Sequence, residues 1–211
     1  MSSLLISQPD SIQRRRSPWV WVGLCAWIVV IGAGWGSLTS YANRPGETGA
    51  APAFVSQPAT SSPRKCRLLM FVHPHCPCTA ASMSELARVM SRCSHVIDAT
   101  VYFFRPDRET DDWVNGNLWE SASAIPGVHA EIDQRGQTAS RFGSTTSGDV
   151  LLYDVSGHLR FHGGITAARG HEGDSQGKSA VMAIARGQSG KVDSTPVFGC
   201  VFRKQVKSNG K

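Results

Sequence analysis

The chain has 211 residues, enough for one domain of ordinary size with additional segments. Its formal net charge is +6, but part of this charge lies in the triplet Arg14-Arg15-Arg16 and part in a polar tail at residues 204–211. The middle of the sequence has no basic helix and no surface pattern of aromatic and arginine residues, so the composition argues against nucleic-acid binding.

An apolar segment without charged residues runs from Trp19 to Tyr41, directly after the arginine triplet. A stretch of about 20 or more such residues can span a bilayer as a helix. Because positive charge before the span keeps the N-terminus inside, we expect residues 1–17 in the cytoplasm, an inner-membrane helix at 18–41 and the rest in the periplasm of a bacterium. The alternative is a signal peptide cleaved after the small-residue pattern Ser40-Tyr41-Ala42.

Residues 42–65 are rich in Pro, Ala, Ser and Gly, which predicts a flexible linker before a folded domain at 66–203. Cys25 lies in the membrane segment, where it serves as a small apolar residue. The exported part contains the other five cysteines: Cys66, Cys76, Cys78, Cys93 and Cys200. Disulfides persist outside the cytoplasm, and an odd number of cysteines leaves at least one thiol free or exchanging partners.

The domain alternates strand and helix patterns. A continuous apolar run at 67–72 predicts a strand buried on both faces, and apolar residues at helical spacing predict a helix at 79–90. The remaining patterns predict strands at 96–104, 128–132, 150–153 and 159–162, and helices at 111–123, 134–142 and 177–186. The turn Asp154–Gly157 joins two of the strands as a hairpin. This order predicts an α/β sandwich with a mixed sheet.

Four segments carry a family resemblance: FVHPHCPCT, SGDVLLYD, GGITAARGHEGD and TPVFGC. Together with the order of elements they resemble the thioredoxin-like superfamily over roughly residues 66–187. They are similar in particular to a membrane-anchored, RedB-like group related to TlpA-type envelope thioredoxins. The resemblance implies a thioredoxin-like sandwich and thiol–disulfide exchange as the reaction class, without naming a substrate.

Two positions depart from the thioredoxin pattern. The usual Cys-x-x-Cys motif is here Cys76-Pro77-Cys78-Thr79, so Cys78 and Thr79 compete for the place of the resolving residue. The proline that normally forms a cis peptide before the hairpin strand is replaced by Gly148.

We expect the thiol chemistry of the chain at the turn that contains Cys76 and Cys78, which we call the cysteine turn. A thiol at a helix N-terminus has a lowered pKa, which makes Cys76 the candidate nucleophile, and His73 and His75 could add positive charge or carry protons. Residues two apart point to opposite sides of a helix. A Cys76–Cys78 disulfide should therefore be strained and easily reduced, which predicts an oxidising or isomerising poise.

A second pair of cysteines is predicted to be structural. A strand over 67–73 rises about 23 Å, and a helix over 78–93 returns about the same distance. Cys66 and Cys93 then meet at the far end of the domain, where we expect a structural disulfide. This leaves Cys76, Cys78 and Cys200 as the exchanging set, that is, the cysteines available for thiol–disulfide exchange.

A glycine-rich loop follows the hairpin. Residues 173–179 approach a phosphate-binding loop, but the first glycine is one residue too close to the second, so we reject that function. The topology brings the loop toward the cysteine turn, which makes Arg169 and His171 candidates for stabilising the thiolate and Glu172 a candidate for moving protons. The alternative is a loop held by its own turns, with its charges in solvent. The sequence leaves open whether the chain returns to bring Cys200 to the same end.

The function expected first is a membrane-anchored periplasmic thiol–disulfide oxidoreductase that needs no cofactor and acts on protein thiols and disulfides of the envelope. The alternative is a copper-binding protein that uses His73, His75, Cys76 and Cys78, because soft thiolates and imidazoles suit Cu(I). A peroxidase and a catalytically silent interaction domain are weaker alternatives.

Overall fold

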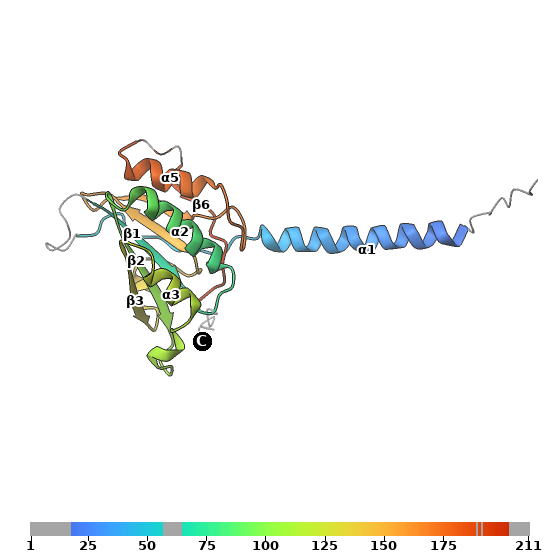
Figure 1. The fold of residues 1–211 in the computed structure, drawn as a ribbon, viewed down its shortest axis with the longest axis horizontal. Coiled ribbons are helices and arrows are strands. Elements are labelled where there is room, and N and C mark those ends of the chain that lie inside the picture. Colours follow the sequence, from blue (N-terminus) through green and yellow to red (C-terminus); the bar gives the residue numbers. More distant parts are fainter. Residues whose placement is uncertain (1–17, 57–64, 189, 191, 203–211) are drawn as a thin grey trace, which may run out of the picture. The chain divides into compact units, whose positions relative to one another are not determined.

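The computed structural model describes residues 18–56, 65–188, 190 and 192–202. The chain divides into two compact units, Met1–Tyr41 and Ala42–Lys211, which we describe separately. The first contains helix α1 (Pro18–Ala42; Figure 1), whose 25 residues make it long and apolar enough to cross a membrane, a test that a signal sequence also passes. The predicted cytoplasmic segment 1–17 and the tail 204–211 lie outside the described residues.

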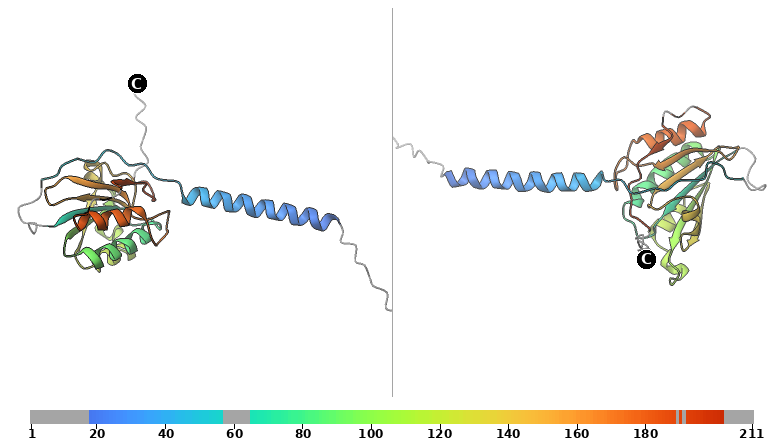
Figure 2. Two further views of the ribbon diagram at one scale, coloured as in Figure 1. Left: turned by 90° about the horizontal axis from the view of Figure 1, so that it is seen from above. Right: turned by 180° about the vertical axis from the view of Figure 1, so that it is seen from behind.

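The second unit is built on a six-stranded mixed sheet with the order β3-β2-β1-β4-β5-β6 (Figures 1 and 2). The strands are β1 (Cys66–Val72), β2 (Ile97–Arg105), β3 (Val128–Gln134), β4 (Asp149–Tyr153), β5 (Leu159–Gly164) and β6 (Ser194–Thr195). Strand β1 pairs in parallel with β2 and antiparallel with β4, and β4 and β5 form the predicted hairpin. The predicted mixed α/β sheet is therefore confirmed.

Both faces of the central strand are buried, as its continuous apolar run predicts. Leu68, Met70 and Val72 of β1 belong to the larger core, together with residues of α2, α3 and α5. Leu69 and Phe71 point to the other face and belong to a second core with residues of α4. The bounds of these helices are α2 (Thr79–Cys93), α3 (Asn117–Ser123), α4 (Gln137–Arg141) and α5 (Gln176–Ala185). The pairing of β1 with β2 and β4 sets the direction of the strand, whose carboxyl end leads into the cysteine turn.

Two predicted elements differ in detail. The helix expected at 111–123 is a 3-10 turn, η1 (Asp111–Trp113), followed by α3, because Gly116 between them is extended. Strand β3 continues to Gln134, which shortens the helix expected at 134–142 to α4. Strand β6 was not anticipated, since two residues are too few to form a sequence pattern.

Part of the segment predicted as a flexible linker is packed against the domain. We call residues 46–55 the N-terminal strap. The Gly46 N–H donates to the Val197 carbonyl at 2.8 Å, and the Leu159 N–H donates to the Ala53 carbonyl at 2.9 Å. Ala51 of the strap also packs on the second core, to which Ala139 of α4 belongs. Residues 57–64 lie outside the described part of the chain.

Cys66 and Cys93 lie at the same end of the domain, as predicted. The Cys66 N–H donates to the Val96 carbonyl (2.8 Å), and the Val96 N–H donates to the Cys93 carbonyl (2.9 Å). Both cysteines are buried, and both carry free thiols in this structure. Burial raises the pKa of the Cys66 thiol, so it is a poor nucleophile. The disulfide between them stays a prediction.

A buried ion pair joins the two main helices. Glu85 of α2 is fully buried, and its Oε2 lies 2.8 Å from Nζ of Lys178 on α5. Its Oε1 accepts the Gly173 N–H at 2.7 Å. Burial alone would raise the pKa of Glu85, but Lys178, the Gly173 N–H and Arg88 outweigh it and hold that pKa below its usual range. The bond from Gly173 therefore ties the glycine-rich loop to α2. The contribution of the ionised Glu85 to stability disappears as the pH falls through that lowered pKa.

We expect Glu85→Ala to lower the free energy of unfolding by about 3–5 kcal/mol, because it leaves the Lys178 ammonium buried without its partner. Urea unfolding of the full chain in detergent measures this loss. The double variant Glu85→Met with Lys178→Met buries no charge and should recover most of the loss. An equal loss in the single and double variants would contradict this explanation.

Candidate functional site

The predicted cysteine turn lies between the end of β1 and the start of α2. Two consecutive turns form it, since the Cys76 N–H donates to the His73 carbonyl (3.0 Å) and the Thr79 N–H donates to the Cys76 carbonyl (3.1 Å). Helix α2 begins at Thr79, and Cys78 is its N-cap residue. Cys76 therefore precedes the helix by three residues rather than standing in its first turn.

The chain returns after α5 and brings Cys200 to the cysteine turn, which settles the question that the sequence leaves open. The Ser147 N–H donates to the Cys200 carbonyl (2.8 Å), and the Phe202 N–H donates to the Thr145 carbonyl (2.9 Å). These bonds frame an antiparallel bridge between Thr146 and Val201.

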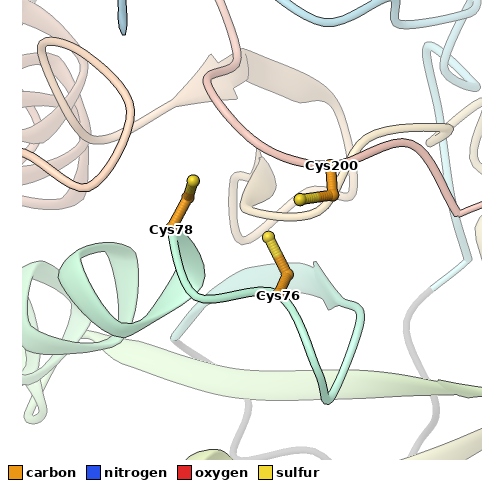
Figure 3. Close-up of side chains that lie close together, drawn as sticks. All are labelled: Cys76, Cys78 and Cys200. Atoms are coloured by element: carbon orange, nitrogen blue, oxygen red, sulfur yellow. The ribbon is translucent and has the colours of Figure 1, made fainter.

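Three thiols consequently form one cluster. The sulfur atoms of Cys76, Cys78 and Cys200 all lie within 4.8 Å of one another. Figure 3 shows the side chains of Cys76 and Cys200 pointing toward each other, while Cys78 approaches from the start of α2. Cys76 is only 1% exposed, and the other two are half-buried. The structure thus brings together the three cysteines that the sequence predicts as the exchanging set.

The groups around Cys76 favour the thiolate form of its side chain. Burial acts to raise its pKa, but hydrogen bonds from the Cys200 thiol, the Thr79 hydroxyl and the N–H groups of Cys200 and Cys78 outweigh burial and lower the pKa below its usual value. A lowered pKa increases the fraction of thiolate, which is the nucleophile. The prediction of a nucleophilic Cys76 therefore gains a physical basis in these donors.

A chain of hydroxyl groups supports one of these donors. The Ser147 hydroxyl lies 2.7 Å from the Thr79 hydroxyl and accepts the His73 N–H at 2.8 Å. Either hydroxyl can be the donor in the bond between Ser147 and Thr79, and this bond ties Ser147 to the residue that begins α2. Ser147 is fully buried. Sequence reasoning missed it, and its only sequence signal was its place next to Gly148.

The pKa of the Cys200 thiol is shifted in the opposite direction, upward. Burial, the hydrogen bond to Cys76 and the charges of Cys76 and Cys78 raise the pKa of its thiol to about 12, against the opposing charge of Arg169. The Arg169 guanidinium also donates to the Gly199 carbonyl. Arg169, predicted to stabilise the Cys76 thiolate, is therefore placed beside the segment that carries Cys200.

The two histidines face an aromatic group rather than the sulfur cluster. The ring of His75 lies 4.4 Å from that of Trp113, and the ring of His73 lies 5.5 Å from it. Burial and the neighbouring His75 lower the pKa of His73, and its Nδ1 accepts the His75 N–H at 3.2 Å. Among the described residues, the group of possible metal ligands consists of the three cysteines alone. The predicted copper set with His73 and His75 is not assembled here.

The glycine-rich loop is held mainly on the side of α2. Glu172, predicted to move protons near Cys76, forms an ion pair with Arg88 of α2 at 2.9 Å. His171 is exposed, and its N–H donates to the Ala168 carbonyl (3.2 Å). The catalytic role predicted for His171 stays a prediction.

Gly148 occupies the position that the sequence analysis gives it. Its φ of +89° is one that glycine adopts readily, and its N–H donates to the Phe71 carbonyl at 2.8 Å. The described residues contain no cis peptide bond. The glycine therefore keeps the segment before β4 beside the cysteine turn with a trans backbone.

Comparison with known proteins finds structures of similar fold. No family model and no curated protein matches the sequence. A hypothetical protein from Sinorhizobium meliloti is similar in structure, with 20% identity, a TM-score of 0.57 and coverage of 76% of this chain and 96% of that chain. An uncharacterized conserved protein from Geobacillus kaustophilus is also similar, with 14% identity, a TM-score of 0.55 and coverage of 79% and 95%.

Thioredoxin-like proteins are also among the structural neighbours. One was solved in its oxidized form and has 14% identity, a TM-score of 0.47 and coverage of 70% of this chain and 97% of that chain. At such identities the likeness concerns the fold alone. The chain has the mixed sheet that the sequence analysis predicts, with the cysteine turn between the central strand β1 and helix α2.

We expect Thr79→Val to raise the pKa of Cys76, because the variant removes a hydroxyl donor from the thiolate. The rate of Cys76 alkylation, followed by peptide mass spectrometry across a pH series, should then rise at higher pH than in the parent chain. Thr79→Ser keeps the hydroxyl and should leave the profile in place. An unshifted profile in Thr79→Val would show that this hydroxyl does not act on the sulfur.

Proposed function

We propose that the chain is a membrane-anchored thiol–disulfide oxidoreductase of the bacterial envelope, with Cys76 as its nucleophile. The observation that carries this proposal is a buried thiol of lowered pKa, Cys76, in hydrogen-bond contact with a second thiol, Cys200. A close pair in which one sulfur ionises and its neighbour keeps its proton is suited to disulfide exchange. The apolar helix α1, preceded by the arginine triplet, supports an anchor with the domain in the periplasm.

The reaction proceeds through a mixed disulfide. The Cys76 thiolate attacks a partner disulfide, so that a bond to Cys76 forms, the partner bond breaks, and the second partner sulfur leaves as a thiolate that takes a proton from solvent. Cys200 then loses its proton to solvent and attacks the Cys76 sulfur. The first partner sulfur leaves, and a Cys76–Cys200 disulfide remains. The partner disulfide has gained two electrons and two protons, and the reverse sequence oxidises a partner dithiol.

Cys78 provides a second resolving thiol. It is half-buried at the start of α2 and lies within the same 4.8 Å cluster. Thr79, which competes with it for the resolving position in the motif, has a different role because its hydroxyl is a hydrogen-bond donor to Cys76. Cys200 is favoured over Cys78 as the first resolving residue because its thiol is directed at Cys76.

A redox titration of the full chain in detergent tests the oxidoreductase. Thiols are trapped at each buffer potential, and every cysteine is mapped by peptide mass spectrometry. We expect a Cys76–Cys200 disulfide to form with a midpoint between about −120 and −270 mV, the range of catalytic dithiols. Cys76→Ser should abolish that transition, and Cys66 and Cys93 should remain paired throughout. A chain whose Cys76 never forms a disulfide would contradict the proposal.

A second candidate function is the binding of Cu(I). Three sulfur atoms within 4.8 Å of one another favour it, since thiolates are the ligands that this soft ion prefers. The ligands would be Cys76, Cys78 and Cys200, and the histidines of the earlier set would stay outside. Elemental analysis of the full chain purified from copper-supplemented cells separates the two functions. Stoichiometric copper that is lost in Cys200→Ser but retained in His75→Ala would favour metal binding, and its absence would favour the oxidoreductase.

A further inference from the structure

A cavity of about 290 Å³ lies between the strap, the start of α4 and the loop at residues 143–145. Its wall also includes the end of β2 and the two residues after Cys200, and none of its described lining residues is a cysteine. Pockets for small molecules start at about 300 Å³ and are mostly apolar, with a few polar groups that fix the ligand. The cavity therefore has the size for a molecule with one ring and a short chain.

The strap is fixed to the rest of the cavity wall through its backbone. The Gly49 N–H donates to the Gly143 carbonyl at 2.6 Å, and a Cβ on Gly143 would clash with the Ala50 carbonyl oxygen. The Thr146 hydroxyl donates to the Glu47 carbonyl at 2.6 Å. These bonds hold the strap against the loop before β4 and keep Glu47 at the rim of the cavity.

One polar side chain of the wall lacks a partner. Ser144 is 3% exposed, and its buried hydroxyl forms no hydrogen bond with any described residue. Its main chain is bonded, since the Ser144 N–H donates to the Ala139 carbonyl at 2.8 Å. A buried hydroxyl without a partner is unfavourable. Ser144 therefore favours a ligand that brings a hydrogen-bonding group into the cavity.

The remaining wall is apolar on one side and acidic at the rim. Phe104 and Phe202 stack on each other with ring centroids 5.9 Å apart, and the buried Ala139 lines the same cavity. Glu47 is exposed and is the one ionisable residue among the described residues of the lining. A carboxylate at the rim attracts a cation and repels an anion. The wall thus complements a ligand with an aromatic body and a positive charge.

We propose that this cavity binds a small phenolic amine, that is, a molecule with one hydroxyl-bearing aromatic ring and a cationic amino group on a short chain. The ring packs on Phe104 and Phe202, the ring hydroxyl bonds to Ser144, and the ammonium group faces the Glu47 carboxylate. A phenolic hydroxyl both donates and accepts hydrogen bonds, as the serine hydroxyl does. The ligand contacts Phe202, two residues after Cys200, and so lies against the segment that carries the second thiol of the exchange.

Isothermal titration calorimetry of the full chain in detergent tests the proposal with three probes of similar size. We expect tyramine to bind, and phenethylamine, which lacks the ring hydroxyl, to bind about fivefold more weakly, the effect of one net hydrogen bond. We expect para-hydroxyphenylacetate, in which a carboxylate replaces the ammonium group, not to bind. The absence of tyramine binding, or binding of para-hydroxyphenylacetate as tight as that of tyramine, would overturn the proposal.

Variants of the full chain locate the bound probe. We expect Ser144→Ala to weaken tyramine binding about fivefold and to leave phenethylamine binding unchanged, because only tyramine has the hydroxyl that Ser144 bonds. Glu47→Gln should weaken the binding of both amines. Ser91→Ala is the control, since it removes a hydroxyl of α2, outside the cavity, that donates to the Arg88 carbonyl at 2.9 Å. Tyramine binding that is the same in all three variants would overturn the proposal.

The basic tail at residues 204–211 is the other occupant that the acidic rim would attract. A chain that ends at residue 203 separates the two occupants in the same titration. We expect this chain and the full chain to bind tyramine equally. Binding by the shortened chain alone would assign the cavity to the tail and overturn the proposal.

Discussion

A thiolate at Cys76 has to be solvated by the protein, because water hardly reaches a side chain that is 1% exposed. The donors that do this come from parts of the chain that are distant in sequence. The cysteine turn supplies the Thr79 hydroxyl and the Cys78 N–H, and the segment after Val197 supplies the thiol and the N–H of Cys200. Ser147, which precedes β4, is hydrogen-bonded to the Thr79 hydroxyl. The nucleophile is therefore a property of the assembled fold and not of the Cys-Pro-Cys motif alone.

The order of the sheet makes this assembly possible. Strand β1 lies between the parallel β2 and the antiparallel β4, so the carboxyl end of β1 and the amino end of β4 meet at one edge. Gly148 marks this meeting, since its N–H donates to the Phe71 carbonyl. The segment that carries Cys200 reaches the same edge because β6 pairs in parallel with β5, which itself ends there. The order of the strands thus brings the three cysteines and the hydroxyl groups of Thr79 and Ser147 together.

Most of the sheet could be predicted from the sequence, but the positions of Ser147 and Cys200 in the site could not. Continuous apolar runs and helical spacing are local patterns, so β1, α2 and the β4–β5 hairpin were predictable near their observed bounds. The positions of Ser147 and Cys200 depend on backbone bonds between segments that are far apart in the sequence, and such irregular pairings leave no periodicity in it. The packing of the strap was not predictable for a related reason. Its Pro- and Ala-rich composition is that of a linker, while the core on which it packs belongs to another part of the chain.

The pKa of Cys76 is lowered and that of Cys200 is raised, and this difference sets the order of the steps in the proposed exchange. While Cys76 is a thiolate, its charge and the hydrogen bond that Cys200 donates to it are among the causes that raise the pKa of Cys200 to about 12. Cys200 is then a poor nucleophile and cannot compete with Cys76 for an incoming disulfide. Once Cys76 forms a mixed disulfide, its charge disappears and its sulfur accepts hydrogen bonds only weakly. Both causes are removed together, so the pKa of Cys200 falls at the step where the proposed mechanism needs its thiolate.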